Sequence, residues 1–148
     1  MSLNFREILR GSYFCVDAQD AVRVCEVQLD IRMPRSHVDR RRAHATMAGS
    51  ATFDGLCAGA PLVGSLVFDL RRPRRITYEF TFQADDGRSL RFQGAKHPSL
   101  LRPLFTSTTL WGTIFDGTTA IAMARLNFDL RRDLVTFLQS LAREAEAG

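Results

Sequence analysis

Lysine is almost absent from this sequence of 148 residues, which contains one lysine, Lys96, and nineteen arginines. Phosphate-binding surfaces use either residue, so this bias indicates codon preference rather than a basic binding face. The arginines gather at predicted turns, in 40–42 and 71–75, and the acids Asp39 and Asp69 stand close to them. Interspersed acids break up a continuous basic surface. We therefore predict no nucleic-acid partner, although the net charge of the chain is +4.

Cysteine and histidine are also scarce, and neither is spaced as metal ligands are. An odd number of cysteines without a C-x-x-C spacing excludes a disulfide framework and a zinc ribbon. The histidines lack the i, i+4 pairing of a zinc site, and no glycine-rich phosphate loop or G-x-S-x-G motif is present. We expect no catalytic residues, no metal and no cofactor; the residues considered are Cys15, Cys25, Cys57, His37, His44 and His97.

Long hydrophobic runs are missing as well. No window approaches the ~18–20 apolar residues of a membrane-spanning helix. The first residues, Met1–Glu7, include an acid and an asparagine where the apolar part of a signal peptide would begin. With 45% hydrophobic residues the chain resembles a globular domain. The sequence predicts one domain over residues 1–148, cytoplasmic and without integral membrane association.

Most of the chain alternates between apolar and polar residues with a period of two, which is typical of half-buried strands. This pattern predicts strands over 22–33, 43–53, 62–70, 76–83, 89–96, 108–115 and 120–128. Residues 3–14 fit either a first strand or a short helix, and a strand is favoured. Asp86-Gly87 and Asp116-Gly117 are hairpin signals, because glycine supplies the positive φ of a tight turn. A Gly/Ala/Pro-rich stretch to Pro61 is interpreted as a connection.

The period changes to that of a helix after Asp129, with apolar residues such as Leu134 and Phe137 at helical spacing. We expect an amphipathic α-helix over about residues 130–146. The predicted fold class is therefore mainly β, an antiparallel meander β-barrel of about eight strands, lipocalin-like, with one C-terminal α-helix. A curved sheet wrapped on the helix is the alternative.

An eight-stranded barrel is wide enough to be filled by side chains or to hold one small ligand. Lys96 continues the apolar face of its strand, so it would hold an anionic ligand group or carry Schiff-base chemistry. The alternatives are that Lys96 reaches solvent or pairs with Asp85 or Glu79. The candidate ligand-binding residues are Tyr78, Phe80, Phe92, Lys96, Thr109 and Trp111.

One stretch resembles a known accessory region. It runs Tyr78-x-Phe80-x-Phe82, then Asp86-Gly87 and Gly94-x-Lys96, followed by Thr108-Thr109-Leu110-Trp111. These motifs are similar to the all-β segment beside the flavin domain of some long bacterial GMC-type, cholesterol-oxidase-like oxidoreductases. The resemblance covers roughly residues 49–141. It implies a module that acts beside an oxidoreductase or a lipid-metabolising enzyme and supplies no catalytic residue itself.

Three functions follow from these observations. The favoured one is a non-catalytic barrel that binds a hydrophobic or amphiphilic small molecule, sterol- or fatty-acid-like. The second is an accessory module for an oxidoreductase partner. The third is a cofactor-free isomerase or cyclase that uses Lys96 or a tyrosine as acid–base. For quaternary structure we expect a homodimer, formed through an exposed edge or the C-terminal helix.

Overall fold

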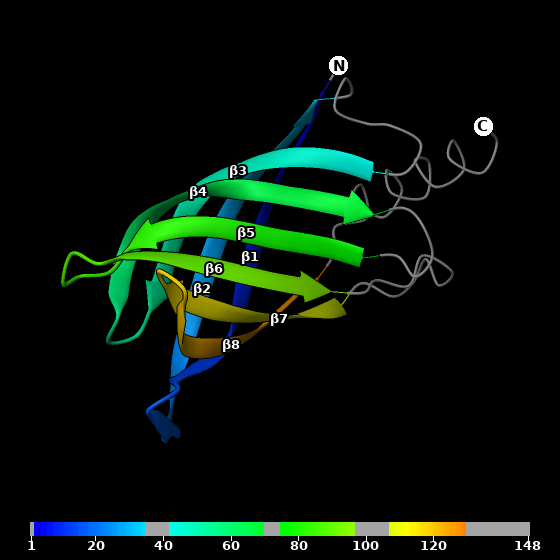
Figure 1. Cartoon of the computed structure of the whole chain (residues 1–148). Coiled ribbons are helices and arrows are strands. Elements are labelled where there is room, and N and C mark those ends of the chain that lie inside the picture. The colour runs from blue at the N-terminus through cyan, green and yellow to red at the C-terminus, as the bar shows by residue number, and fades with distance from the viewer. Residues whose placement is uncertain (1, 35–41, 70–74, 97–106, 130–148) are drawn as a thin grey trace.

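A computed structural model describes residues 2–34, 42–69, 75–96 and 107–129. These residues form eight β-strands (Figure 1), and the helix expected over residues 130–146 lies outside them. The strands are β1 (Ser2–Cys15), β2 (Ala18–Pro34), β3 (Arg42–Phe53), β4 (Cys57–Asp69), β5 (Arg75–Gln83), β6 (Ser89–Lys96), β7 (Ser107–Asp116) and β8 (Thr119–Asp129).

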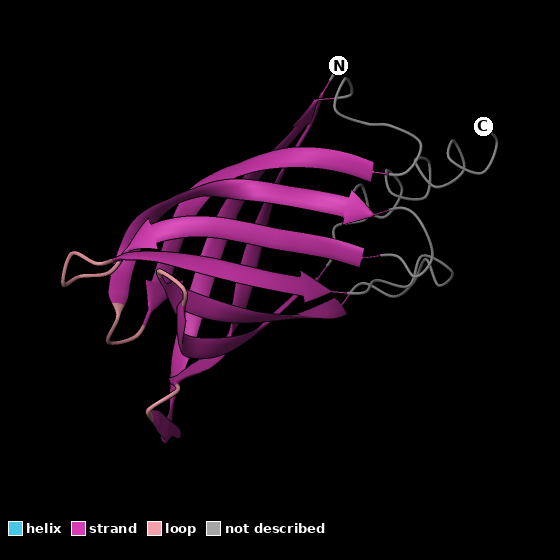
Figure 2. Ribbon diagram, in the orientation of Figure 1, coloured by secondary structure: helices cyan, strands magenta, loops and turns pink. Residues whose placement is uncertain are grey.

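The strands form a closed antiparallel meander barrel. Each strand pairs with the next along the chain, and β1 pairs with β8 to close the sheet. Figure 2 shows the strands curving around a common interior. This confirms the predicted mainly β antiparallel meander barrel. Closure gives every strand two neighbours, which removes the exposed edges of an open sheet.

Alternation along each strand separates the barrel interior from its outer wall. On β5, for example, Ile76, Tyr78, Phe80 and Phe82 are buried, whereas the residues between them are exposed or half-buried. A similar alternation continues in most of the other strands, although the first seven residues of β2 are all exposed. The interior therefore collects most of the large apolar side chains. The faces predicted from the period-two pattern are therefore confirmed.

Three hairpins at one end of the barrel contain the dipeptide Asp-Gly. The glycines Gly55, Gly87 and Gly117 all have positive φ, between 62° and 94°. Non-glycine residues rarely adopt this conformation, so these glycines fix the tight returns between β3 and β4, β5 and β6, and β7 and β8. The predicted turns at 86–87 and 116–117 are confirmed.

The connection expected before Pro61 is wrong, because β4 already begins at Cys57. Ala60 and Pro61 stand opposite Ala51 and Ser50 of β3 in an antiparallel register. Glycine and proline interrupt the apolar–polar alternation there, which hid the strand. Gly59 has a positive φ, a backbone conformation that favours glycine.

A row of stacked aromatic rings crosses the interior. Tyr13 meets Phe53 edge-on at 5.3 Å between ring centroids, and Phe53 stacks on Phe82 at 5.4 Å. Phe82 contacts Phe80, which stacks on Phe92 at 4.7 Å. These separations are those of favourable aromatic pairs. The rings therefore fill this part of the barrel with protein rather than leaving it open to a ligand.

Candidate functional site

Four of the six predicted site residues point into the barrel. Phe80 and Phe92 belong to the aromatic row, and Tyr78 and Lys96 are 1% exposed on the same inner face of β5 and β6. The other two lie on the outer wall. Thr109 is half-buried there and donates a hydrogen bond to Asn127 Oδ1 at 2.8 Å, and Trp111 is 61% exposed. The six residues therefore do not converge on one site.

The interior contains a small polar cluster, formed by Glu7 of β1, Tyr78 of β5 and Lys96 of β6. The Tyr78 hydroxyl donates a hydrogen bond to Glu7 Oε2 at 3.2 Å. Lys96 Nζ lies 4.9 Å from the centroid of the Tyr78 ring, within the range of a cation–π contact. Glu7 and Lys96 are the buried charged residues in the described part of the barrel. We call these three residues the interior cluster.

Burial changes the ionisation of this cluster. Loss of hydration lowers the pKa of Lys96 to about 7, although the charge of Glu7 acts in the opposite direction. Burial also raises the pKa of Tyr78 well above its ordinary value, and Glu7 adds to that rise. The Lys96 amine therefore titrates near neutral pH, whereas an ordinary lysine amine stays almost fully protonated there.

Two of the alternatives for Lys96 are wrong. Its side chain does not reach solvent, because it is 1% exposed. Glu79 lies on the outer wall, where it forms an ion pair with Arg91 at 3.5 Å between Arg91 Nη1 and Glu79 Oε1. The acid whose charge acts on Lys96 is instead Glu7.

Glu7 is the interior residue that the sequence did not reveal. It has the parity of Leu9 and Tyr13, both buried on β1, so strict alternation places it inside the barrel. Alternation could therefore have identified Glu7 as an interior residue. The evidence was weak, because residues 3–14 also fit a short helix, and a helix gives position 7 no inner face.

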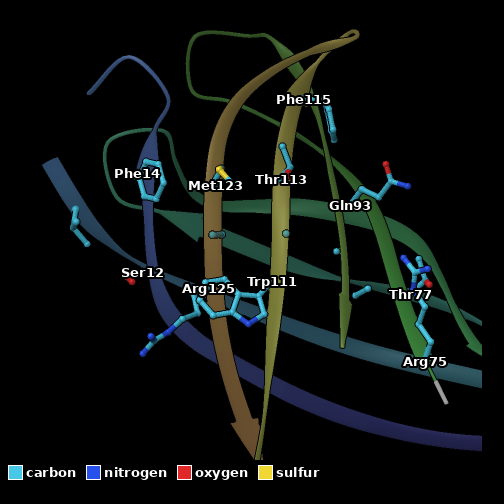
Figure 3. Close-up of a pocket in the computed structure, with 15 residues that line it drawn as sticks. Ser12, Phe14, Arg75, Thr77, Gln93, Trp111, Thr113, Phe115, Met123 and Arg125 are labelled. Atoms are coloured by element: carbon cyan, nitrogen blue, oxygen red, sulfur yellow. The ribbon is translucent and has the colours of Figure 1, made fainter. Parts of the chain in front are cut away.

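A groove of about 670 Å³ lies on the outer wall, over β5–β8 and the neighbouring ends of β1 and β2. Figure 3 shows Trp111 and Phe115 on β7, Met123 and Arg125 on β8, and Phe14 on β1. We call it the Trp111 groove. Its volume falls within the range of about 300–1,000 Å³ that is typical of small-molecule sites.

Small residues form the floor of the Trp111 groove. Gly94, Gly112 and Ala124 stand side by side on β6, β7 and β8. A Cβ atom on Gly112 would lie 2.2 Å from Phe92 Cζ. Glycine at this position thus lets the Phe92 ring pack against the inside of the wall while the groove occupies the outside.

The charges around the Trp111 groove are positive. Arg75 and Arg125 are among its lining residues, and the described residues that line it include no aspartate or glutamate. The Arg125 guanidinium lies 5.7 Å from the centroid of the Trp111 ring. Two guanidinium groups beside an apolar wall are suited to an anionic group attached to an apolar body.

The buried thiols lack the character of nucleophiles. Burial raises the pKa of Cys25 to about 12 and also raises that of Cys57. Because the thiolate is the reactive form, both groups stay protonated near neutral pH. His44 lies on the outer wall, and His37 and His97 fall outside the described residues.

Over the residues that the structure describes, no group of three or more metal-ligating side chains is placed to hold an ion. The same part of the chain contains no helix with the length and hydropathy needed to cross a membrane. Comparison with protein-family models, with curated proteins and with solved structures found no match. The resemblance to the GMC-associated segment therefore stays a prediction.

Proposed function

We propose that this protein binds a small amphiphilic molecule with an acidic head group, of the fatty-acid type, in the Trp111 groove. The main support for this proposal is the lining of the groove, which combines apolar side chains with two arginines. The apolar body of the ligand would lie along Phe14, Phe115 and Met123. Its acidic group would meet the guanidinium of Arg125 or Arg75.

The outer wall supports this proposal better than the interior does. The aromatic row occupies part of the barrel with rings in direct contact, whereas Trp111 and Met123 present apolar surface to solvent. Covering exposed apolar surface contributes about 25 cal/mol per Å² to binding before its entropic costs. The arginines favour a fatty-acid-like ligand over a neutral sterol, because only the former carries a charge for them.

Trp111 allows a direct test, because it is the single tryptophan of the chain. Dodecanoate, titrated below its micelle concentration, should shift and saturate the tryptophan emission. Dodecanol and dodecylamine share the alkyl chain without its negative charge, and we expect at least tenfold weaker binding for both. Equal affinity for all three would show that the arginines do not recognise the head group.

Two variants locate the site by calorimetric titration of dodecanoate. Arg125→Gln removes a charge and should weaken binding about tenfold, in line with roughly 1.5–3 kcal/mol for a hydrogen bond to a charged group. Val63→Ala is the matched control, because Val63 is 63% exposed on β4 and does not line the groove. A loss of affinity in Val63→Ala, with Arg125→Gln unaffected, would place the ligand elsewhere.

A further inference from the structure

The interior cluster lies on the opposite side of the barrel wall from the Trp111 groove and has a different chemistry. We propose that Glu7, Tyr78 and Lys96 form a second site, which captures a short-chain aldehyde or ketone as an imine on Lys96 Nζ. This site does not depend on the function proposed for the groove, because none of its three residues lines the groove.

The position of Lys96 supports this inference. It is the last residue of β6, so it lies at the end of the barrel opposite the three Asp-Gly hairpins. Its side chain is buried beside Tyr78, and the ring of Tyr78 faces the amine at 4.9 Å. Because the amine is buried, a carbonyl compound must be short to reach it from this strand end.

The amine is suited to nucleophilic attack because a large share of it is unprotonated near neutral pH. An ordinary lysine, with a pKa of about 10.4, is unprotonated in only about one molecule in two thousand at pH 7. The pKa of Lys96 is about 7, so about half of the molecules carry the reactive form. Desolvation in an apolar pocket is a known means of activating an amine.

Glu7 and Tyr78 supply the charged and titratable groups that face the amine. Glu7 projects from β1 and Tyr78 from β5, and the two are joined by the 3.2 Å hydrogen bond. The inward-facing described residues of β2, β3, β4, β7 and β8 carry no charge. Among the described residues, burial and the charge of Glu7 are the influences that shift the pKa of Lys96.

The reaction balances without an oxidant or a reductant. The Nζ lone pair attacks the carbonyl carbon, a C–N bond forms, and the π pair of the C=O bond moves to oxygen. A proton passes from nitrogen to that oxygen to give a carbinolamine. When its hydroxyl is protonated, the C–O bond breaks, water leaves and the C=N bond forms. The nitrogen then releases its remaining proton, which gives the imine. The Tyr78 hydroxyl and the Glu7 carboxyl, which are joined by their hydrogen bond, are the groups that we expect to move these protons.

Because Lys96 is the only lysine, trapping the imine gives a clear result. The full-length protein is treated with acetaldehyde and cyanoborohydride at pH 7, and ethylation is mapped by peptide mass spectrometry. A Val63→Lys variant supplies an exposed reference amine, since position 63 lies on the outer wall between Ala48 and Thr81. We expect Lys96 to react at least tenfold faster than this reference in the folded protein, and at an equal rate in guanidinium chloride. An equal or slower rate in the folded protein would overturn the proposal.

Two further variants separate a chemical role from a structural one. Tyr78→Phe keeps the ring and removes the hydroxyl, so labelling should slow about tenfold while its pH midpoint stays near that of the wild type. Glu7→Gln removes the charge that raises the pKa of Lys96, so the midpoint should move to lower pH. Unchanged rate and midpoint in both variants would show that neither group serves the amine. Trp111→Ala should leave labelling intact, which separates this site from the groove.

Discussion

Lys96 links the ionisation of one residue to the stability of the fold. Its pKa is about 7 in the folded barrel and about 10.4 in an unfolded chain, so between these values the unfolded state binds more protons. Stability contributed by Lys96 therefore rises with pH across this window, and below about pH 7 the fold carries the full cost of protonating a buried amine. That cost is on the order of 4 kcal/mol.

We expect the wild-type melting temperature to rise between about pH 7 and about pH 8.5. Above that range the raised pKa values of Cys25 and Cys57 oppose the rise, because their thiols lose protons first in the unfolded state. In Lys96→Met this rise should disappear, because the substituted side chain has no proton to gain. Thermal denaturation followed by circular dichroism at several pH values measures both slopes. The double variant Lys96→Met/Glu7→Gln controls for the carboxylate left behind. A wild-type slope that persists in Lys96→Met would assign the pH dependence to another group.

Single residues differed in how far the sequence could place them. Lys96 followed Leu90, Phe92 and Gly94 on one face, and that parity is confirmed. Trp111 was ambiguous, because β7 carries large apolar residues on both faces, so alternation gave no inner side. The hydrogen bond between Tyr78 and Glu7 joins residues that are 71 positions apart in the sequence. Local periodicity does not show that their two strands face each other.

At the scale of the strands, glycines mark points where neighbouring strands approach closely. A Cβ atom on Gly49 would lie 1.9 Å from the backbone oxygen of Gln28, and one on Gly112 would lie 2.2 Å from Phe92 Cζ. The two contacts differ in kind, because a backbone oxygen is held by the sheet, whereas a side chain can be shortened by substitution.

We therefore expect Gly49→Ala to be the more damaging change, with a loss of about 4 kcal/mol or more in the free energy of unfolding. Gly112→Ala should cost about 1–3 kcal/mol as overpacking, and Phe92→Leu in the same chain should relieve part of it. Gly59→Ala meets nothing within 4 Å and should cost about 1–2 kcal/mol for its positive φ alone. Urea denaturation gives all four values. Equal losses at positions 49 and 59 would contradict the close-approach argument.

Strands and their faces could be predicted because alternation is a local property of the sequence. Strand ends were less predictable: β4 begins within the Gly/Ala/Pro-rich stretch, and β2 begins at Ala18, before the alternation becomes regular. The register is irregular there, since Tyr13 pairs with Arg23 but Cys15 pairs with Ala18. Three extra residues on β2 disrupt the period on which the prediction depended.

For the whole molecule, closure between β1 and β8 makes β8 a central strand. Ala124 stands between Tyr13 of β1 and Gly112 of β7. Proline removes a backbone donor, so it is tolerated at edges and bulges but not within a paired strand. Ala21 provides the contrast, because it lies in the irregular part of β2, where the pairs with β1 and β3 omit it.

We expect Ala124→Pro to cost about 3 kcal/mol or more and to abolish cooperative unfolding of the closed barrel. Ala21→Pro should cost less than about 1 kcal/mol. Urea unfolding followed by far-ultraviolet circular dichroism measures the difference. If Ala124→Pro were tolerated as well as Ala21→Pro, the seam between β1 and β8 would not be closed in solution.

The barrel wall also sets a fixed distance between the single tryptophan of the chain and its single lysine. Ala95 pairs with Trp111, so Lys96 follows a direct neighbour of the tryptophan, but its side chain points to the other face. A short-chain carbonyl compound that quenches indole emission, attached to Lys96 by the imine chemistry, would lie across a single layer of sheet from the Trp111 ring. One native emitter and one native attachment point would thus report events inside and outside the same wall without an engineered label site.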